Sequence, residues 1–187
     1  MDKANELSNF IFELGQLKQI KRSGWRLLGI ENPESIAEHN LRAAQIGYIL
    51  ARLEKYPKPE EVCTILVFHE LAECRIGDID KVANRYVSYN EKSVINDQTN
   101  ALGELGASIK NEAEKILSKD TKEGIIAKDA DWLETAFTAK EYQEKGYDTK
   151  DWIENMVSRI KTKSAKSLAK SLMKSSSIDW WKGLKKF

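Results

Sequence analysis

The amino-acid sequence predicts an all-α protein. Apolar residues recur every three or four positions through most of the chain, which is the spacing of one helix face. The 187 residues include only three prolines and ten glycines, few for an all-β protein, and no segment alternates convincingly between apolar and polar residues. This length fits one domain with a substantial core, so we expect a single domain over residues 1–187.

The N-terminal part predicts two helices joined by an irregular segment. Residues 4–20 carry an apolar stripe at helical spacing, and the chain is then expected to run as a loop to Pro33. Ser35 and Glu38 form the S-x-x-E pattern of a capping box. They predict a helix that begins there, continues to about residue 54 and is apolar on most of its surface, as a central helix would be.

The next helix is expected to begin at Pro59, which suits a first-turn position, and to run to about Cys74. Gly77-Asp78 then interrupts the chain, and residues 79–90 are expected to form a short helix and a loop.

The second half predicts one long helix followed by shorter ones. Residues 91–118 are expected to be continuous despite Gly103 and Gly106. Further helices are expected over about residues 121–146, 149–160 and 165–173. We expect the helices of about residues 148–187, including Trp180-Trp181, to pack on the domain or on a partner chain.

Charge and cysteine content describe an ordinary protein of a reducing compartment. Residues 150–187 hold ten Lys/Arg and three Asp/Glu, a surplus of seven that we interpret as a solvated helix face rather than an anion-binding surface. Cys63 and Cys74 would lie about 16 Å apart on one helix, too far to bridge, so free thiols and a cytoplasmic location are expected. No apolar run is long enough to predict a membrane span.

The chain has two histidines, and each adjoins a carboxylate, as Glu38-His39 and His69-Glu70. Both histidines lie on apolar stripes of different predicted helices, and Glu73 follows His69 by one helical turn. Imidazole and carboxylate together suit one divalent ion such as Mn, Fe, Co, Ni or Zn. Hydrogen-bonded core histidines would give the same pattern, and the residues alone leave both interpretations open.

A zinc-protease interpretation of His69-Glu70-Leu71-Ala72-Glu73 is disfavoured. The H-E-x-x-H motif needs a second histidine four residues after the first, and position 73 is Glu.

Several blocks, taken in order, carry a resemblance to a known family. They are Leu14-Gly15-Gln16-Leu17-Lys18, Arg22-Ser23-Gly24-Trp25, Pro33-Glu34-Ser35-Ile36-Ala37-Glu38-His39, His69-Glu70-Leu71-Ala72-Glu73, Gly77-Asp78-Ile79 and Lys128-Asp129-Ala130-Asp131. Over roughly residues 7–145 the chain resembles the HD-domain 5′-deoxynucleotidases. Each block is weak alone, whereas the ordered set is specific. The resemblance implies a helical HD-domain bundle with a metal site between helices, in a homodimer.

The resemblance also implies a role for each matched residue. His39, His69, Glu70 and Asp131 would hold the metal ion. Glu73 would act on the attacking water or the leaving group, and Asp78 would contribute to catalysis by shaping the substrate site. Arg22 would bind the phosphate, and Trp25 would pack near the sugar and screen for a missing 2′-hydroxyl. Without the resemblance, an exposed cation, a core tryptophan and a turn aspartate are the simpler interpretations of Arg22, Trp25 and Asp78.

Two positions depart from a simple match. The family has His-Asp where this chain has His69-Glu70, and the extra methylene could alter metal preference or slow turnover. Periodicity alone would select Asp129 as the buried acid of its helix, because it shares a face with larger apolar residues. We follow the family in choosing Asp131, and we expect Asp129 to support the site from outside it or to cap a helix.

The expected reaction is hydrolysis of a 2′-deoxyribonucleoside 5′-monophosphate to a deoxynucleoside and phosphate. A metal ion would lower the pKa of water and polarise a phosphoryl oxygen. Another phosphomonoester or a phosphodiester is an alternative substrate, and a nucleotide-binding protein with impaired turnover is an alternative function. A small-molecule nucleotide is the expected partner, without a stable nucleic-acid complex.

Overall fold

The computed structural model describes residues 2–118 and 120–184, and within them the chain forms nine α-helices and no named β-strand. The all-α prediction is therefore confirmed. The helices are α1 (Lys3–Leu14), α2 (Ile36–Leu53), α3 (Pro59–Phe68), α4 (Glu73–Ile76), α5 (Glu91–Thr99), α6 (Glu104–Lys115), α7 (Lys122–Glu144), α8 (Lys150–Arg159) and α9 (Lys163–Leu172). None of the helices in the described ranges is long and apolar enough to cross a membrane.

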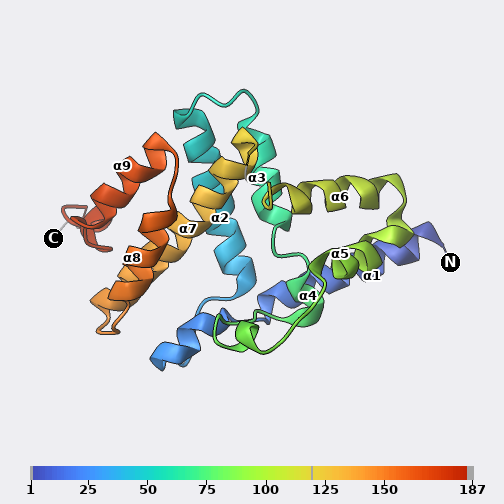
Figure 1. Cartoon of the computed structure of the whole chain (residues 1–187), viewed down its shortest axis with the longest axis horizontal. Helices are drawn as coiled ribbons and strands as arrows, with labels where there is room; N and C mark the ends of the chain where they lie inside the picture. Colours follow the sequence, from blue (N-terminus) through green and yellow to red (C-terminus); the bar gives the residue numbers. More distant parts are fainter. Residues whose placement is uncertain (1, 119, 185–187) are drawn as a thin grey trace.

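The helices form two groups that meet at α2 and α3 (Figure 1). On one side α7 lies against α2, and α8 and α9 lie beside α7. On the other side α1, α4, α5 and α6 form a second group, which carries the N-terminus at the end opposite to the C-terminus. The side-chain core between α2, α3, α7 and α9 includes Leu50, Leu66 and Leu133, all fully buried.

Local capping signals fix several helix ends where the sequence predicts them. Ser35 Oγ accepts a hydrogen bond from the Glu38 backbone N–H, and the Glu38 carboxylate accepts one from the Ser35 backbone N–H, so the capping box that begins α2 is confirmed. Thr121 caps α7 through its side chain, and Gly146, with a φ of 100°, follows the end of that helix.

The predicted helix from Pro59 to Cys74 is wrong as a single element. The regular α-helix ends at Phe68, and the chain then winds through backbone hydrogen bonds to the third preceding residue, such as Leu71 N–H to Phe68 O at 3.1 Å. The Gln98 side chain donates to Leu71 O at 3.0 Å. The same carbonyl oxygen also accepts the Cys74 backbone N–H at 3.2 Å, so Gln98 adds a side-chain hydrogen bond to this tightly wound segment.

The predicted helix over residues 91–118 is also wrong, because it divides at Gly103. This glycine has a φ of 60° and separates α5 from α6. Gly106, at the start of α6, allows close contact with the end of α5, since a Cβ there would lie 1.9 Å from the Thr99 carbonyl oxygen.

Gly106→Ala is therefore expected to destabilise the fold. The added methyl group meets backbone, which cannot move aside by a rotamer change, so we expect the free energy of unfolding to fall by about 1–3 kcal/mol. Urea denaturation followed by circular dichroism measures it. Gly15→Ala is the matched control, because its Cβ would find nothing closer than Lys18 Cε at 3.7 Å. Equal midpoints for both variants would contradict this account of the α5–α6 contact.

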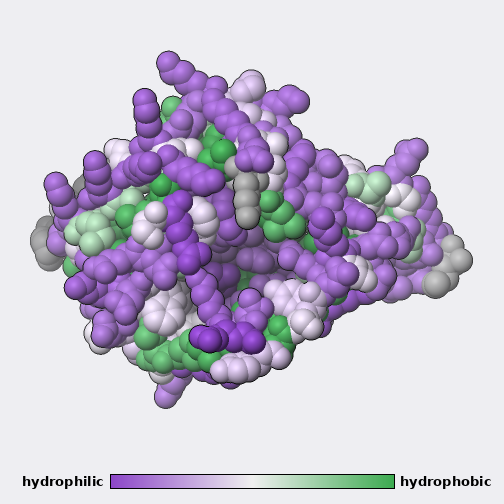
Figure 2. All heavy atoms as spheres, in the orientation of Figure 1, coloured by the Kyte–Doolittle hydropathy of each residue, from purple (hydrophilic) through white to green (hydrophobic). Residues whose placement is uncertain are grey.

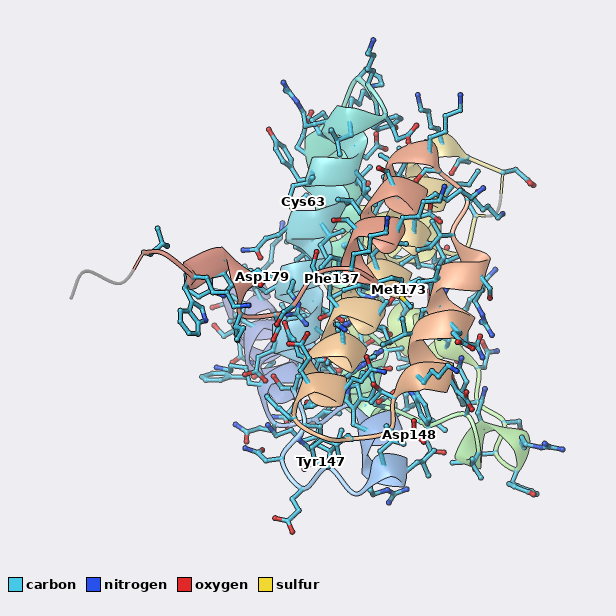
Figure 3. All side chains as sticks on the ribbon, turned by 90° about the vertical axis from the view of Figure 1, so that its left-hand side faces the viewer. Cys63, Phe137, Tyr147, Asp148, Met173 and Asp179 are labelled. Atoms are coloured by element: carbon cyan, nitrogen blue, oxygen red, sulfur yellow. The ribbon has the colours of Figure 1, made fainter. Side chains whose placement is uncertain are left out.

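The C-terminal region is partly as expected. The predicted helices over about residues 149–160 and 165–173 are present as α8 and α9, which lie along α7. The turn that contains Asp179 projects from the body of the helices (Figure 3), and Trp180 is 77% exposed, so Trp180 does not pack onto this chain, and its packing onto a partner chain stays a prediction. Residues 185–187, the end of the basic region, lie outside the described residues.

Candidate metal centre

The four residues predicted to hold a metal ion lie together where α2, α3 and α7 meet. His39 belongs to α2 and Asp131 to α7, while His69 and Glu70 directly follow the last residue of α3. Each offers one ligand atom, and these atoms lie within 4.8 Å of one another. His39 Nε2 is 3.2 Å from Asp131 Oδ1, and His69 Nε2 is 3.3 Å from Glu70 Oε1. Two imidazoles and two carboxylates are a suitable ligand set for a divalent transition metal.

The two imidazoles fit a metal ion as their missing partner. Both Nε2 atoms are buried, and neither makes a well-directed hydrogen bond to any described residue. His39 Nδ1 lies 2.5 Å from Glu134 Oε2, and His69 Nδ1 lies 2.7 Å from the Leu66 carbonyl oxygen. Because carboxylate and carbonyl oxygens accept hydrogen bonds, we assign a proton to each Nδ1, which leaves each Nε2 as the atom that can bind a metal ion. A buried nitrogen without a partner is costly, and a cation would satisfy both.

The protonation of the two histidines differs because their neighbours differ. Burial and Arg22 would lower the pKa of His39, but Glu134 and Asp131 outweigh them and raise it to about 9. Burial lowers the pKa of His69 below its ordinary value. Without a metal ion, His39 therefore carries a second proton, on Nε2, at neutral pH, and a bound cation would displace that proton.

The two ligand carboxylates remain ionised because cations lie beside them. Burial would raise the pKa of Asp131, but Lys128, with Nζ 2.8 Å from Asp131 Oδ2, and the histidines hold it well below its usual range. Burial would likewise raise the pKa of Glu70, and His69 and Arg22 instead lower it. Arg22 Nη1 lies 3.7 Å from Glu70 Oε1. The longer Glu70 side chain thus still reaches the cluster.

Glu73 is a half-buried carboxyl group beside the ligands. Its Oε2 has no hydrogen-bond partner among the residues that the structure describes. Burial, followed by the charges of Glu70 and Asp78, raises the pKa of Glu73 to about 10. The tight winding after Phe68 replaces the single helical turn predicted between His69 and Glu73, but it leaves Glu73 next to the cluster.

A cavity of about 520 Å³ opens in front of this cluster, between α7, α8 and the loop after α4. That volume is typical of small-molecule sites. Arg22, Trp25, Glu73 and Asp78 all line it, as do Glu70, Asp131 and the two tryptophans of the α7–α8 wall, Trp132 and Trp152. Figure 2 shows a hollow with largely hydrophilic walls near the centre of the face in view.

Arg22, Asp78 and Trp25 hold the turn that forms one wall of the cavity. Asp78 Oδ2 accepts a hydrogen bond from the Ser23 backbone N–H at 2.5 Å, and Arg22 donates to Thr135 Oγ1 at 3.3 Å. The expected loop after Arg22 is a short 3₁₀ helix over Ser23–Leu28. Trp25, in this helix, is only 2% exposed and donates from Nε1 to Glu34. Most of its indole ring therefore belongs to the core.

Asp129 is fully buried, as periodicity predicts, but it faces away from the metal cluster. Its carboxylate accepts the backbone N–H groups of Lys161 and Thr162, at 3.0 and 2.7 Å, just before α9. The expectation that Asp129 caps a helix end fits this position.

Sequence reasoning did not identify Glu134, Arg42 or Lys128 as neighbours of the site. Glu134 lies one helical turn after Asp131 and is completely buried. A charged residue one turn from a predicted ligand is a signal that could have identified it.

Comparison with known proteins identifies the family of this helical protein. A family model described as HD domain matches residues 14–173. The 5′-deoxynucleotidase HDDC2 of Dictyostelium discoideum is 31% identical over 160 residues, which cover 79% of this chain and 84% of that protein. The 5′-deoxynucleotidase hdd1 of Schizosaccharomyces pombe is 35% identical over 165 residues, which cover 81% and 80%.

A solved structure gives the same result for the fold. A conserved hypothetical protein from Pyrococcus furiosus superimposes with a TM-score of 0.73 at 26% identity, covering 89% of this chain and 99% of that one. The chain belongs to the HD domain family. The resemblance stated from the sequence blocks is thereby confirmed.

Proposed function

We propose that this protein is a metal-dependent 5′-deoxynucleotidase, which uses water to convert a 2′-deoxyribonucleoside 5′-monophosphate into a deoxynucleoside and phosphate. The observation that carries the proposal is the cluster of His39, His69, Glu70 and Asp131, with ligand atoms within 4.8 Å, at the base of a cavity large enough for a nucleotide. The relatives named 5′-deoxynucleotidase support the substrate class.

The metal ligands, Arg22, Glu73 and Asp78 each have a proposed part in the reaction. A divalent ion held by the four ligands would acidify water and polarise a phosphoryl oxygen. Arg22 presents two guanidinium nitrogens that can bind a phosphate oxygen pair. Glu73 is positioned to transfer a proton to or from the reacting oxygens. Asp78 holds the turn that carries Arg22, through the Ser23 backbone.

The preference for deoxyribose is proposed to depend on Trp25. Its indole is fixed by a hydrogen bond of 3.2 Å to Glu34 Oε1 and by an edge contact with Tyr142 at 5.2 Å between ring centroids. A rigid ring at the cavity wall leaves no room for adjustment around a 2′-hydroxyl.

Metal add-back tests the proposed function. Protein stripped with a chelator is expected to release no phosphate, and one of Mn²⁺, Co²⁺, Ni²⁺, Fe²⁺ or Zn²⁺ is expected to restore release from dAMP, because Lewis-acid assistance is worth several kcal/mol. AMP and a generic phosphomonoester are the comparison substrates. Hydrolysis of dAMP and AMP at the same rate would contradict the proposed role of Trp25 in selecting deoxyribose. Nucleotide binding without phosphate release under every metal would overturn the proposed activity.

We also propose that the protein acts as a homodimer in the cytoplasm. The dimer follows from the family resemblance, and the compartment is supported by Cys63 and Cys74, both free thiols in the described chain.

A further inference from the structure

The second nitrogen of His39 contacts a carboxylate that the proposed reaction does not use. His39 Nδ1 lies 2.5 Å from Glu134 Oε2, and both side chains have no exposed surface. His39 comes from α2 and Glu134 from α7, two helices that lie against one another (Figure 1). The contact therefore joins the two helices that supply His39 and Asp131 to the metal cluster.

The orientation of the Glu134 carboxylate is itself fixed. Its Oε1 accepts a hydrogen bond from Arg42 Nε at 2.9 Å and another from Thr138 Oγ1 at 2.9 Å. Arg42 is held in turn by Glu141, with Nη1 2.6 Å from Glu141 Oε1. Because three donors divide between the two oxygens, the carboxylate cannot rotate without losing a buried hydrogen bond.

Glu34, His39 and Glu134 could instead be taken for a second metal site, since their ligand atoms also lie within 4.8 Å of one another. The donors around them exclude that interpretation. The hydrogen bond to Glu134 occupies His39 Nδ1, and the Arg42 guanidinium occupies Glu134 Oε1. Glu34 Oε1 also accepts a hydrogen bond from Trp25 Nε1 at 3.2 Å. A cation there would have to displace the Nδ1 proton of His39 and would lie beside the positive charge of Arg42.

We propose that Glu134 is a positioning residue for the metal centre. By accepting from Nδ1–H, it keeps His39 in the tautomer whose Nε2 carries the lone pair and aims that nitrogen at Asp131. His69 obtains the same orientation from the Leu66 backbone carbonyl, which no side-chain substitution removes. Glu134 is thus the one described side chain that sets a ligand tautomer here. The inference rests on the proposed metal centre.

Glu134→Gln tests this role by metal affinity. An amide cannot accept from both His39 and Arg42, so its NH₂ group must face one of them and disturb the ring or the guanidinium. We expect the dissociation constant for Mn²⁺ or Co²⁺, measured by chelator competition, to rise about 10- to 100-fold. Glu141→Gln is the matched control, because it touches the same Arg42 without touching His39, and it should bind metal as the wild type does.

The outcomes separate this role from the proposed function. Unchanged affinity in Glu134→Gln, or equal weakening in Glu141→Gln, would overturn the positioning role while the metal centre stands. A wild-type protein that binds neither ion would overturn both.

A second measurement needs no variant, in case Glu134→Gln does not fold. The chain has two histidines, so imidazole ¹⁵N spectra of the Zn²⁺-loaded wild type contain few signals. A protonated Nδ1 on both rings is expected, and an unprotonated Nδ1 on His39 would overturn the role of Glu134.

Discussion

Asp131→Asn is expected to abolish both metal binding and phosphate release. Asp131 Oδ1 lies 3.2 Å from His39 Nε2 and 3.9 Å from His69 Nε2, so this carboxylate is close to the metal-binding nitrogens of both imidazoles. An amide oxygen supplies no charge to a divalent ion. We expect kcat/KM for dAMP to fall by more than about 10³-fold, since each 1.36 kcal/mol of lost stabilisation is worth a factor of ten. Metal titration and phosphate release measure the two effects.

Asp129→Asn is the matched control on the same helix. Asp129 accepts backbone N–H groups ahead of α9 and is not part of the ligand cluster. Its substitution should lower the free energy of unfolding by about 1 kcal/mol and leave metal affinity unchanged. The reverse pattern, with Asp129→Asn losing metal and Asp131→Asn retaining it, would show that periodicity selected the correct ligand and the family resemblance did not.

Glu73→Gln is expected to separate metal binding from catalysis. Glu73 lines the cavity, and its Oε2 is buried without a hydrogen-bond partner in the described part of the chain. Glutamine keeps the shape of the side chain but cannot transfer a proton. We expect kcat for dAMP to fall by about 10²- to 10⁴-fold while the metal dissociation constant changes little.

Glu13→Gln provides the comparison for Glu73→Gln. Glu13 contacts α4 through Arg75 at 2.6 Å, but it does not line the cavity. The control should retain full activity. A Glu73→Gln variant that loses metal as well would mean that Glu73 maintains the cluster instead of transferring a proton.

Whether a feature could be predicted from the sequence depends on how far apart in the sequence the interacting residues lie. The capping box at Ser35 is a contact between residues three apart, so its residues alone identify the start of α2. After α3 ends at Phe68, the chain is bound by Gln98, which donates to Leu71 O from 27 residues away, and no local pattern contains that contact. The division of α5 from α6 had a local signal in Gly103, but helix propensity gives such a glycine too little weight.

The residues of the candidate site also differ in how far the sequence alone identifies them. His39 and His69 stand out because the chain has no other histidine. Asp129 and Asp131 are both buried, and only the family resemblance favours Asp131, because periodicity reports burial and not the direction in which a carboxylate points. Glu134 was not predicted, because its partners Arg42 and His39 lie more than 90 residues away.

The ion pairs beside the ligands have a consequence for the order of binding. Arg22 and Lys128 bring two positive charges to the two carboxylates Glu70 and Asp131, so this part of the cavity is close to electrically balanced. Under the proposed function, a divalent ion that displaces the second proton of His39 would add about one positive charge to this balance. A phosphomonoester dianion is attracted to that added charge more strongly than a phosphodiester, which carries one negative charge. Binding of the metal ion would thus create the attraction for a terminal phosphate, and the same attraction would act on the product phosphate.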